Sequence, residues 1–260
     1  MEIYYSPELI NKKDQEMIKS IYYGANTWLI ELNGIKILID PWIKGSLVFS
    51  PGAWFLKGER MDKVPIINDI DLILLTQGLP DHTHLESLKL LPKNTKVVCP
   101  KTSEKTLAKA GFHDINILYP RESIKINNLL IIASEGASVP NIENGYLLKD
   151  QFNSIYIEPH GFLDENIPPQ SIDAIITPTV DIEIPMLGRF IQGNKVIPDL
   201  IKLFNPKVIL ASTTGGDIKF TGLISSIIRQ KGSIKDIEDK LPINVELIDP
   251  IIGFEYKIGV

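Results

Sequence analysis

Cysteine is almost absent from this chain, since Cys99 is the only one among 260 residues. A single thiol excludes an internal disulfide, and because Cys99 ends the apolar run that starts at Lys96 we expect it to be buried and structural. Long apolar runs are also lacking, because no stretch approaches the roughly 20 residues that span a bilayer. The N-terminus, Met1 to Pro7, has no basic region ahead of an apolar one. These absences predict a protein of the reducing cytoplasm with no membrane partner.

An excess of positive charge is lacking as well. The chain has 27 lysines and arginines against 32 acidic residues, a net charge of −5. This balance leaves no cationic face large enough for nucleic acid. We therefore expect no nucleic-acid partner, and a small-molecule substrate or ligand instead.

Linkers, low-complexity segments and short repeats are missing too. A chain of 260 residues with 44% hydrophobic content can bury roughly three quarters of its unfolded surface, which is enough for a substantial core. The order of its elements has a coarse two-part rhythm. We predict one domain, residues 1–260, built of two similar halves at about 1–140 and 141–260.

Short β-rich runs alternate with a few helical stretches along the chain. Asn33-Gly34 predicts a tight hairpin between two of the strands, because Asn-Gly is typical of such turns. The alternation of strands with helices favours sheet layers covered by helices. The predicted strands are 27–32, 35–40, 72–76, 96–99, 115–119, 129–133, 145–148, 154–158, 174–177, 208–211, 245–247 and 254–258, and the predicted helices lie near 85–90, 102–110, 197–204 and 222–230.

What the chain does contain is a polar loop after the predicted strand that ends at Thr76. This loop includes Gln77, Leu79, Asp81 and His82. Imidazole nitrogen and carboxylate oxygen bind zinc, whereas a neutral amide is a poor ligand and leucine is none. Taken alone, Asp81 and His82 also fit a loop that caps the following helix, since aspartate is a favoured N-cap residue.

This loop, together with an earlier strand that runs into Asp40-Pro41-Trp42, resembles the metallo-β-lactamase superfamily. The signature of that superfamily is an apolar strand ending in Ser or Thr, followed by His-x-His-x-Asp-His. Gln77 and Leu79 stand at the first two histidine positions, while Asp81 and His82 match the last two. The resemblance therefore keeps half of the signature ligands.

Further phrases resemble a divergent branch of the superfamily, found in cyanobacteria and plants, whose members are named metal-dependent hydrolases. They are Glu143 to Tyr146, Glu158 to Gly161 and Gly216-Asp217, and the resemblance covers about residues 21–260. It implies an α/β fold of the α+β kind, a four-layer αββα sandwich of two mixed β-sheets with helices outside. It also implies a site at one edge of the sandwich, where loops of both halves meet.

Histidine is too scarce for the dinuclear site of that superfamily, which uses five histidines and a bridging aspartate. The chain has four, at positions 82, 84, 113 and 160. By the resemblance, His160 takes the position of the bridging aspartate, and Asp217 is the nearest ligand-type residue where the last histidine is expected. We predict at most a mononuclear site for one zinc, iron or manganese ion, with the ligands Asp81, His82, His160 and Asp217 and with His84 as an alternative ligand.

An ion held by three nitrogen or oxygen ligands would leave a position open for water and lower the pKa of that water. The predicted reaction is attack of this water on an ester, lactone, amide or phosphoester. Asp81, Gln77 and Glu158 are the candidate catalytic residues, with Asp81 as the base that orients the water. The resemblance implies that Asp40 supports the loop by hydrogen bonds. His84 is expected in the first turn of the next helix, facing solvent.

The aromatic loop 49–56 is the candidate substrate pocket. Trp54 and Phe55 would form one wall, and Arg189 would anchor an anion on the opposite wall. The alternative interpretation is a packed plug over the sandwich edge and a solvated surface arginine.

A second class of function competes with the hydrolase. A non-catalytic ligand-binding or scaffold protein could have kept the fold after losing its metals, and it would hold no metal ion. Polar residues in the predicted site loops favour the enzyme, whereas the scarcity of histidine favours the alternative. Loss of an ancestral metal site would be compatible with a homodimer across the aromatic loop. A serine nucleophile is disfavoured because no Gly-x-Ser-x-Gly elbow occurs.

Overall fold

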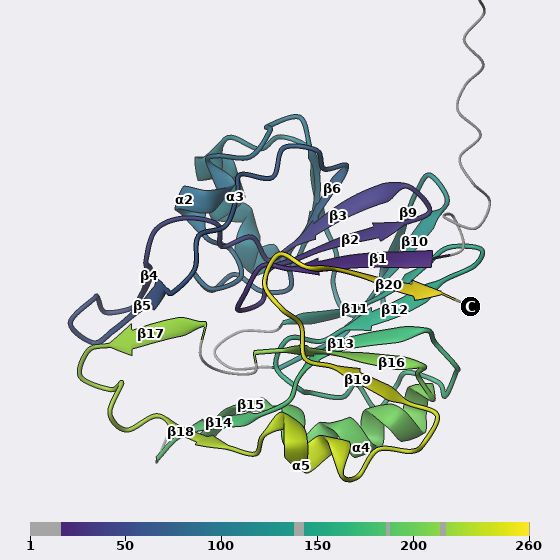
Figure 1. The fold of residues 1–260 in the computed structure, drawn as a ribbon. Helices are drawn as coiled ribbons and strands as arrows, with labels where there is room; N and C mark the ends of the chain where they lie inside the picture. The colour runs from purple at the N-terminus through teal and green to yellow at the C-terminus, as the bar shows by residue number, and fades with distance from the viewer. Residues whose placement is uncertain (1–16, 138–142, 186–187, 214–216, 260) are drawn as a thin grey trace, which may run out of the picture.

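Two seven-stranded β-sheets lie face to face in the computed structural model, which describes residues 17–137, 143–185, 188–213 and 217–259 (Figure 1). The first sheet has the order β20-β1-β2-β3-β6-β7-β8. Its strands are β1 (Met17–Tyr22), β2 (Trp28–Leu32), β3 (Ile35–Ile39), β6 (Leu72–Leu74), β7 (Lys96–Cys99), β8 (Ile115–Ile117) and β20 (Glu255–Gly259).

The second sheet has the order β19-β16-β13-β12-β11-β10-β9. Its strands are β9 (Ser123–Ile126), β10 (Leu129–Glu135), β11 (Asn144–Lys149), β12 (Ser154–Ile157), β13 (Ala174–Pro178), β16 (Val208–Ser212) and β19 (Glu246–Ile248). In each sheet, three antiparallel pairings are followed by three parallel ones, counted from β20 in the first sheet and from β9 in the second.

The division between the sheets does not coincide with the division of the chain near residue 140. Strands β9 and β10 precede that point but belong to the second sheet, and the C-terminal strand β20 completes the first. The single domain with two similar halves stays a prediction. The shared pattern of pairings is what two related halves would produce.

The main core lies between the sheets. Alternation along the strands creates it, because every second residue of β1 and β2 is buried. Ile30 and Ile37 of the first sheet share one apolar cluster with Ile131, Leu148 and Ile155 of the second. Each sheet thus places one apolar face on the other.

Helices cover the outer faces. Leu88 and Leu107 pack against Ile73 of the first sheet, and Leu200 and Phe204 pack near Tyr156 of the second. The helices are α2 (Leu85–Leu88), the 3₁₀ turn η1 (Lys101–Ser103) and α3 (Glu104–Ala110) on the first sheet, and α4 (Gly193–Phe204) and α5 (Ile234–Glu238) on the second. The predicted four-layer αββα sandwich is confirmed (Figure 1). None of the described helices is both long and apolar enough to cross a membrane.

The predicted Asn33-Gly34 turn connects β2 and β3. Both residues have positive φ, 49° and 76°. A two-residue hairpin with positive φ at both positions matches the right-handed twist of the strands, and Asn-Gly adopts it with little strain. The register of β2 against β3, with Leu32 opposite Ile35, follows from this turn.

Two three-stranded sheets form an extension beside the sandwich (Figure 1). The predicted helix at 222–230 is wrong, because this segment consists of turns that lead into a strand at Arg229. Its spacing of apolar residues suits a helix, but Ile224 packs with Leu56 and Ile184 instead. The strands are β4 (Leu47–Phe49), β5 (Leu56–Arg60) and β17 (Ile218–Thr221) in one sheet, and β14 (Asp181–Ile184), β15 (Gly188–Gln192) and β18 (Arg229–Lys231) in the other.

The thiol of Cys99 is buried at the end of β7, as expected. Burial raises its pKa to about 12. Because the thiolate is the reactive form, we expect native protein at pH 8 to remain unlabelled by iodoacetamide, and protein in denaturant to take up one equivalent. Mass spectrometry distinguishes the two, and complete labelling of the native protein within minutes would contradict the buried position.

Candidate metal centre

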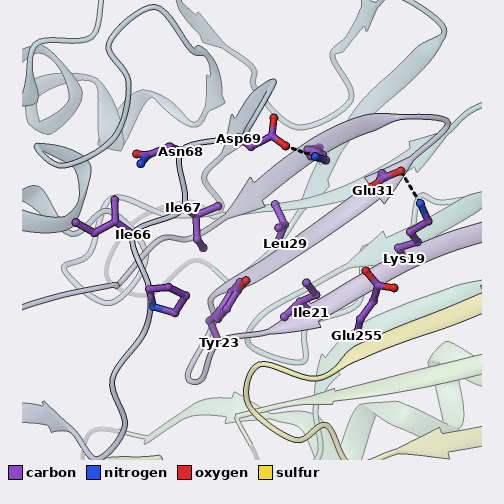
Figure 2. Close-up of a pocket in the computed structure, with 12 residues that line it drawn as sticks. Lys19, Ile21, Tyr23, Leu29, Glu31, Ile66, Ile67, Asn68, Asp69 and Glu255 are labelled. Carbon is purple, nitrogen blue, oxygen red and sulfur yellow. Dashed lines mark hydrogen bonds and ion pairs between the residues drawn. The ribbon is translucent and has the colours of Figure 1, made fainter. Parts of the chain in front are cut away.

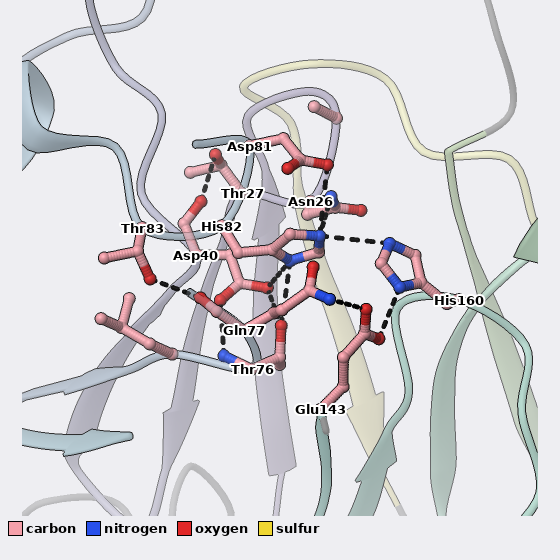
Figure 3. Close-up of polar contacts among 12 residues, drawn as sticks. Asn26, Thr27, Asp40, Thr76, Gln77, Asp81, His82, Thr83, Glu143 and His160 are labelled. Atoms are coloured by element: carbon pink, nitrogen blue, oxygen red, sulfur yellow. Dashed lines mark hydrogen bonds and ion pairs between the residues drawn. The ribbon is translucent and has the colours of Figure 1, made fainter. Parts of the chain in front are cut away.

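The candidate site lies at the edge of the sandwich where strands of both sheets end. Asp40 directly follows β3, Thr76 and Gln77 come shortly after the parallel neighbour β6, and Glu158 directly follows β12 of the second sheet. Carboxyl ends of parallel strands meet at one edge, which is where α/β sheets commonly place their sites. Figure 3 shows the side chains of Asp40, Thr76 and Gln77 close to His82, with His160 and Glu143 on the facing side.

Among the described residues, one group of three can offer ligand atoms to a metal ion. Asp81, His82 and His160 each contribute one such atom, and these atoms all lie within 4.8 Å of one another. The Nε2 atom of His82 lies 3.2 Å from Nε2 of His160 and 3.3 Å from Oδ2 of Asp81. Three of the four predicted metal ligands therefore come together, although 78 positions separate the two histidines.

A buried carboxylate stands behind each imidazole. Asp40 Oδ2 lies 2.7 Å from Nδ1 of His82, and Glu143 Oε2 lies 2.5 Å from Nδ1 of His160. With Nδ1–H donating to the carboxylate, each ring keeps a lone pair on Nε2. Metal-binding histidines are commonly oriented in this way, with the carboxylate setting both the tautomer and the ring position.

Electrostatics also favour a cation here. Burial alone would lower the pKa of His82, but the charges of Asp81 and Asp40 outweigh it and raise that pKa well above its ordinary value. Burial alone would also lower the pKa of His160, but the charge of Glu143 outweighs it and raises that pKa. Burial would raise the pKa of Asp81, yet the two histidines lower it. Three carboxylates thus surround the two facing imidazoles and favour positive charge on or between the rings.

The donor set fits one divalent ion. Two ligands of a tetrahedral zinc ion at about 2.0–2.1 Å lie roughly 3.3 Å apart, close to both separations measured from His82 Nε2. The second oxygen of Asp81, Oδ1, is buried without a hydrogen-bond partner. A buried carboxylate oxygen without a hydrogen-bond partner destabilises the fold unless a ligand, such as a cation or a water molecule, binds to it. Asp81, His82 and His160 are the residues that would hold the ion.

Asp40 connects the site loop to the end of β3. Its Oδ1 accepts the backbone N–H of Thr76 at 2.8 Å, and its Oδ2 accepts the Thr76 hydroxyl at 2.5 Å in addition to His82. Asp40 is fully buried and holds φ at +43°. The expected supporting role of Asp40 is confirmed, and it explains the hydroxyl residue at position 76, two residues after β6.

Gly78 lets the site loop approach η1. A Cβ atom at this position would lie 2.6 Å from the carbonyl oxygen of Thr102, closer than real Cβ atoms come to backbone. The carbonyl of Gln77 accepts hydrogen bonds from the hydroxyls of Thr83 and Ser103. The loop that carries Asp81 and His82 is therefore packed tightly against the 3₁₀ turn.

Gln77 and Glu158, two of the three predicted catalytic residues, lie behind the ligands. Gln77 donates a hydrogen bond through Nε2 to Glu143. Glu158 accepts the backbone N–H groups of His160 at 3.1 Å and Phe162 at 2.8 Å, and burial raises its pKa to about 7. Their contacts hold other parts of the site in position, and a direct part in catalysis stays a prediction.

Glu143 begins one of the phrases that carry the resemblance but was not predicted as a site residue, although it is fully buried and paired with His160. We expect Glu143→Gln to weaken binding of zinc about 10- to 100-fold, because loss of an outer carboxylate typically has this effect on a histidine site. Competition with a chromogenic chelator measures the affinity. Glu165→Gln, at an exposed position, is the matched control and should bind like the wild type. Equal affinity in all three proteins would contradict the role of Glu143.

The other two candidate ligands lie apart from the group of three. Asp217 Oδ2 accepts the hydroxyl of Tyr22 at 2.5 Å and the backbone N–H of Ala25 at 3.2 Å. His84 is the N-cap of α2, with Nδ1 2.8 Å from Ser87 Oγ, and it is buried. The expectation that His84 faces solvent is wrong, because its ring is packed over the 42–46 turn and also lies 3.3 Å from the Ser46 carbonyl.

The predicted pocket residues lie on the extension. Trp54 is 65% exposed and makes an edge-on contact with Phe55, whose ring centroid lies 5.9 Å away. Arg189 is exposed and lies 3.6 Å from Glu183. No hydrogen bond or ring contact connects these three residues to Asp81, His82 or His160 in the described part of the chain. Their place in a substrate pocket stays a prediction.

A cavity of about 390 Å³ lies elsewhere, on the outer face of the first sheet (Figure 2). Its floor includes Ile21 and Leu29 of β1 and β2, and Ile67 closes one side. On its rim Lys19 forms an ion pair with Glu31 at 3.0 Å. None of the predicted site residues lines this cavity.

Comparison with known proteins places the chain in a family. The model of the beta-lactamase superfamily domain matches residues 20–212, so the chain belongs to that family and has the metallo-β-lactamase fold. No curated protein matches the sequence well enough to count as a relative.

Several solved structures share the fold. An isothiocyanate hydrolase from Delia radicum gut bacteria aligns with a TM-score of 0.68 and 15% identity over 93% of this chain and 100% of that one. Igni18, a metallo hydrolase from the archaeon Ignicoccus hospitalis, aligns with a TM-score of 0.62 and 16% identity, covering 94% and 99% of the two chains. CmlA, a diiron β-hydroxylase from Streptomyces venezuelae, aligns with a TM-score of 0.63 and 13% identity over 95% of this chain and 54% of that one. At these identities the likeness is one of fold.

Proposed function

We propose that this protein is a metal-dependent hydrolase with a mononuclear site. The observation that carries the proposal is the pair of Nε2 atoms of His82 and His160, 3.2 Å apart, each with a carboxylate on Nδ1 and with Asp81 beside them. A divalent ion, when bound, supplies a Lewis acid and lowers the pKa of water. The proposed substrates are small molecules with an ester, lactone, amide or phosphoester bond.

The protein's own residues would divide the work as follows. His82 and His160 bind the ion, and Asp40 and Glu143 hold the two rings in the metal-binding tautomer. Asp81 lies at the less buried side of the group. Its Oδ2, 3.3 Å from His82 Nε2, would hold the ion, and its Oδ1 would accept a proton from the water that attacks the substrate. The buried positions of His82 and His160 keep bulk water away from the two imidazoles.

Two of the similar structures support hydrolysis by name, one acting on isothiocyanates and one described as a metallo hydrolase. A third is a β-hydroxylase, which shows that this fold also hosts oxidation. The incomplete signature, with Gln77 and Leu79 at ligand positions, favours the second candidate, a ligand-binding or scaffold protein without a metal ion. Cytoplasmic location and a homodimer remain predictions.

The test begins with elemental analysis of protein purified without chelator or affinity tag. About one equivalent of zinc, iron or manganese is expected. The protein stripped of metal and reloaded with each ion is then screened on 4-nitrophenyl acetate, γ-lactones, amides and bis(4-nitrophenyl) phosphate. Turnover that vanishes on stripping and returns on reloading supports the hydrolase. An ion-free protein that takes up none of the three metals would overturn it and favour the ligand-binding alternative.

A further inference from the structure

Asn26 reaches the metal face from a segment that the signature motif does not include. It lies in the short loop between β1 and β2, and its side chain is 8% exposed. Its Nδ2 atom lies 3.3 Å from His82 Nε2, the nitrogen that would bind the ion. Figure 3 shows the amide on the same side of His82 as Asp81.

The neighbours of the amide determine which end faces His82. In the metal-binding tautomer, the Nδ1–H of His82 donates to Asp40 and Nε2 carries the lone pair, which the NH₂ group of Asn26 faces. The hydroxyl of Thr213 donates to Oδ1 of the same amide at 3.0 Å. The amide is thus oriented with its N–H groups toward the candidate metal site.

The loop itself is held from several sides. Ala25 donates its N–H to Asp217 and accepts the hydroxyl of Ser212 at 3.1 Å. The hydroxyl of Thr27 donates to the carbonyl of Asp40 at 2.9 Å and accepts the N–H of Trp42 at 3.0 Å. A donor fixed in this way needs no reorganisation when charge develops beside it, which is the requirement for electrostatic stabilisation of a reacting oxygen.

We propose that Asn26 donates a hydrogen bond to the substrate oxygen that gains negative charge during the reaction. The inference rests on the proposed hydrolase, because an ion on His82 Nε2 takes the lone pair that the amide now faces. The N–H groups of Asn26 are then released toward an oxygen bound next to His82. This arrangement suits carbonyl substrates, namely esters, lactones and amides. Asp217 and Thr213 act as positioning residues through the loop and the amide.

The test uses the full-length protein loaded with zinc and acetohydroxamate as the probe, since its carbonyl oxygen can bind the ion and accept a hydrogen bond. Asn26→Leu keeps the side-chain size and removes both donors. We expect it to bind one equivalent of zinc like the wild type and to bind acetohydroxamate about 10- to 100-fold more weakly, as for loss of a hydrogen bond to a charged group. Isothermal titration calorimetry measures both.

Two further variants make the result decisive. Thr213→Val removes the hydroxyl that orients the Asn26 amide and leaves the amide itself in place. We expect this variant to bind acetohydroxamate about threefold to tenfold more weakly. Asn68→Leu, at an exposed asparagine on the cavity of Figure 2, should equal the wild type. If Asn26→Leu and Thr213→Val both retain zinc and bind acetohydroxamate like the wild type, the donor role of Asn26 is overturned and the proposed hydrolase is not. Loss of zinc in Asn26→Leu would make Asn26 a ligand and also overturns it. A wild type that takes up no zinc overturns the proposed hydrolase together with this inference.

Discussion

Replacing His160 with alanine is expected to reduce bound divalent ion from about one equivalent to nearly none. His160 supplies one of the three ligand atoms in the group, and its ring is almost fully buried. Neither of the histidines outside the group, His84 and His113, belongs to this set of ligand atoms. A site left with Asp81 and one imidazole has too few ligands for tight zinc binding. Elemental analysis and calorimetric titration with zinc measure the loss, and any metal-dependent turnover should fall with it.

His113→Ala is the matched control for this experiment. His113 is exposed between α3 and β8 and lies outside the group of three. It removes an imidazole from the same protein without touching the site, so it should keep the ion. Retention of a full equivalent in His160→Ala, or loss in both variants, would contradict the assignment of His160 as a ligand.

Replacing Asp40 with alanine is expected to lower the free energy of unfolding by about 3–5 kcal/mol, even without metal. Asp40 is fully buried and accepts hydrogen bonds from the N–H and hydroxyl of Thr76 and from His82. Its removal leaves the buried N–H of Thr76 without this acceptor, and leaves the Thr76 hydroxyl and His82 Nδ1, which lie 3.0 Å apart, with only each other. Urea unfolding followed by tryptophan fluorescence reports the change, because Trp28 and Trp42 are buried close to this residue.

Asp69→Ala provides the comparison. The Asp69 side chain is 88% exposed and pairs with Lys36 at the surface, so its loss should change the free energy of unfolding by less than about 1 kcal/mol. A stability of Asp40→Ala within that same range would show that Asp40 does not hold the site loop together.

The candidate ligand group was predicted from the resemblance to the metallo-β-lactamase superfamily. Asp81 and His82 match the last two positions of its signature, and His160 takes the position of the bridging aspartate. The signature itself is local, since its residues and the strand before them lie within a few positions of one another. The supporting role of Asp40 was predicted from the same resemblance, because Asp40-Pro41-Trp42 follows an apolar strand.

Glu143 and Asn26 could not be found in this way. Both are common polar residues, and each acquires its role from a partner on a distant segment. Asn26 meets His82 across 56 positions of the chain, and Glu143 meets His160 across 17. The burial of these side chains is the second property that the sequence does not reveal. Polar side chains at the ends of strands are usually solvated, and the packing of the two sheets alone makes these two residues buried.

The helix expected at 222–230 illustrates the same division. Its apolar spacing indicates a helix, yet Ile224 finds its apolar partners in β5 and β14, and residues 229–231 pair with β14. Tertiary pairing overrode a local preference of small free energy. The strand alternation and the hairpin turn follow from neighbours in the sequence, where local interactions act. The three candidate ligand positions follow from the resemblance to the superfamily. The carboxylate behind His160, the amide beside His82 and the burial that alters their chemistry arise only when distant segments pack together, because low-dielectric contacts between them do not exist before folding.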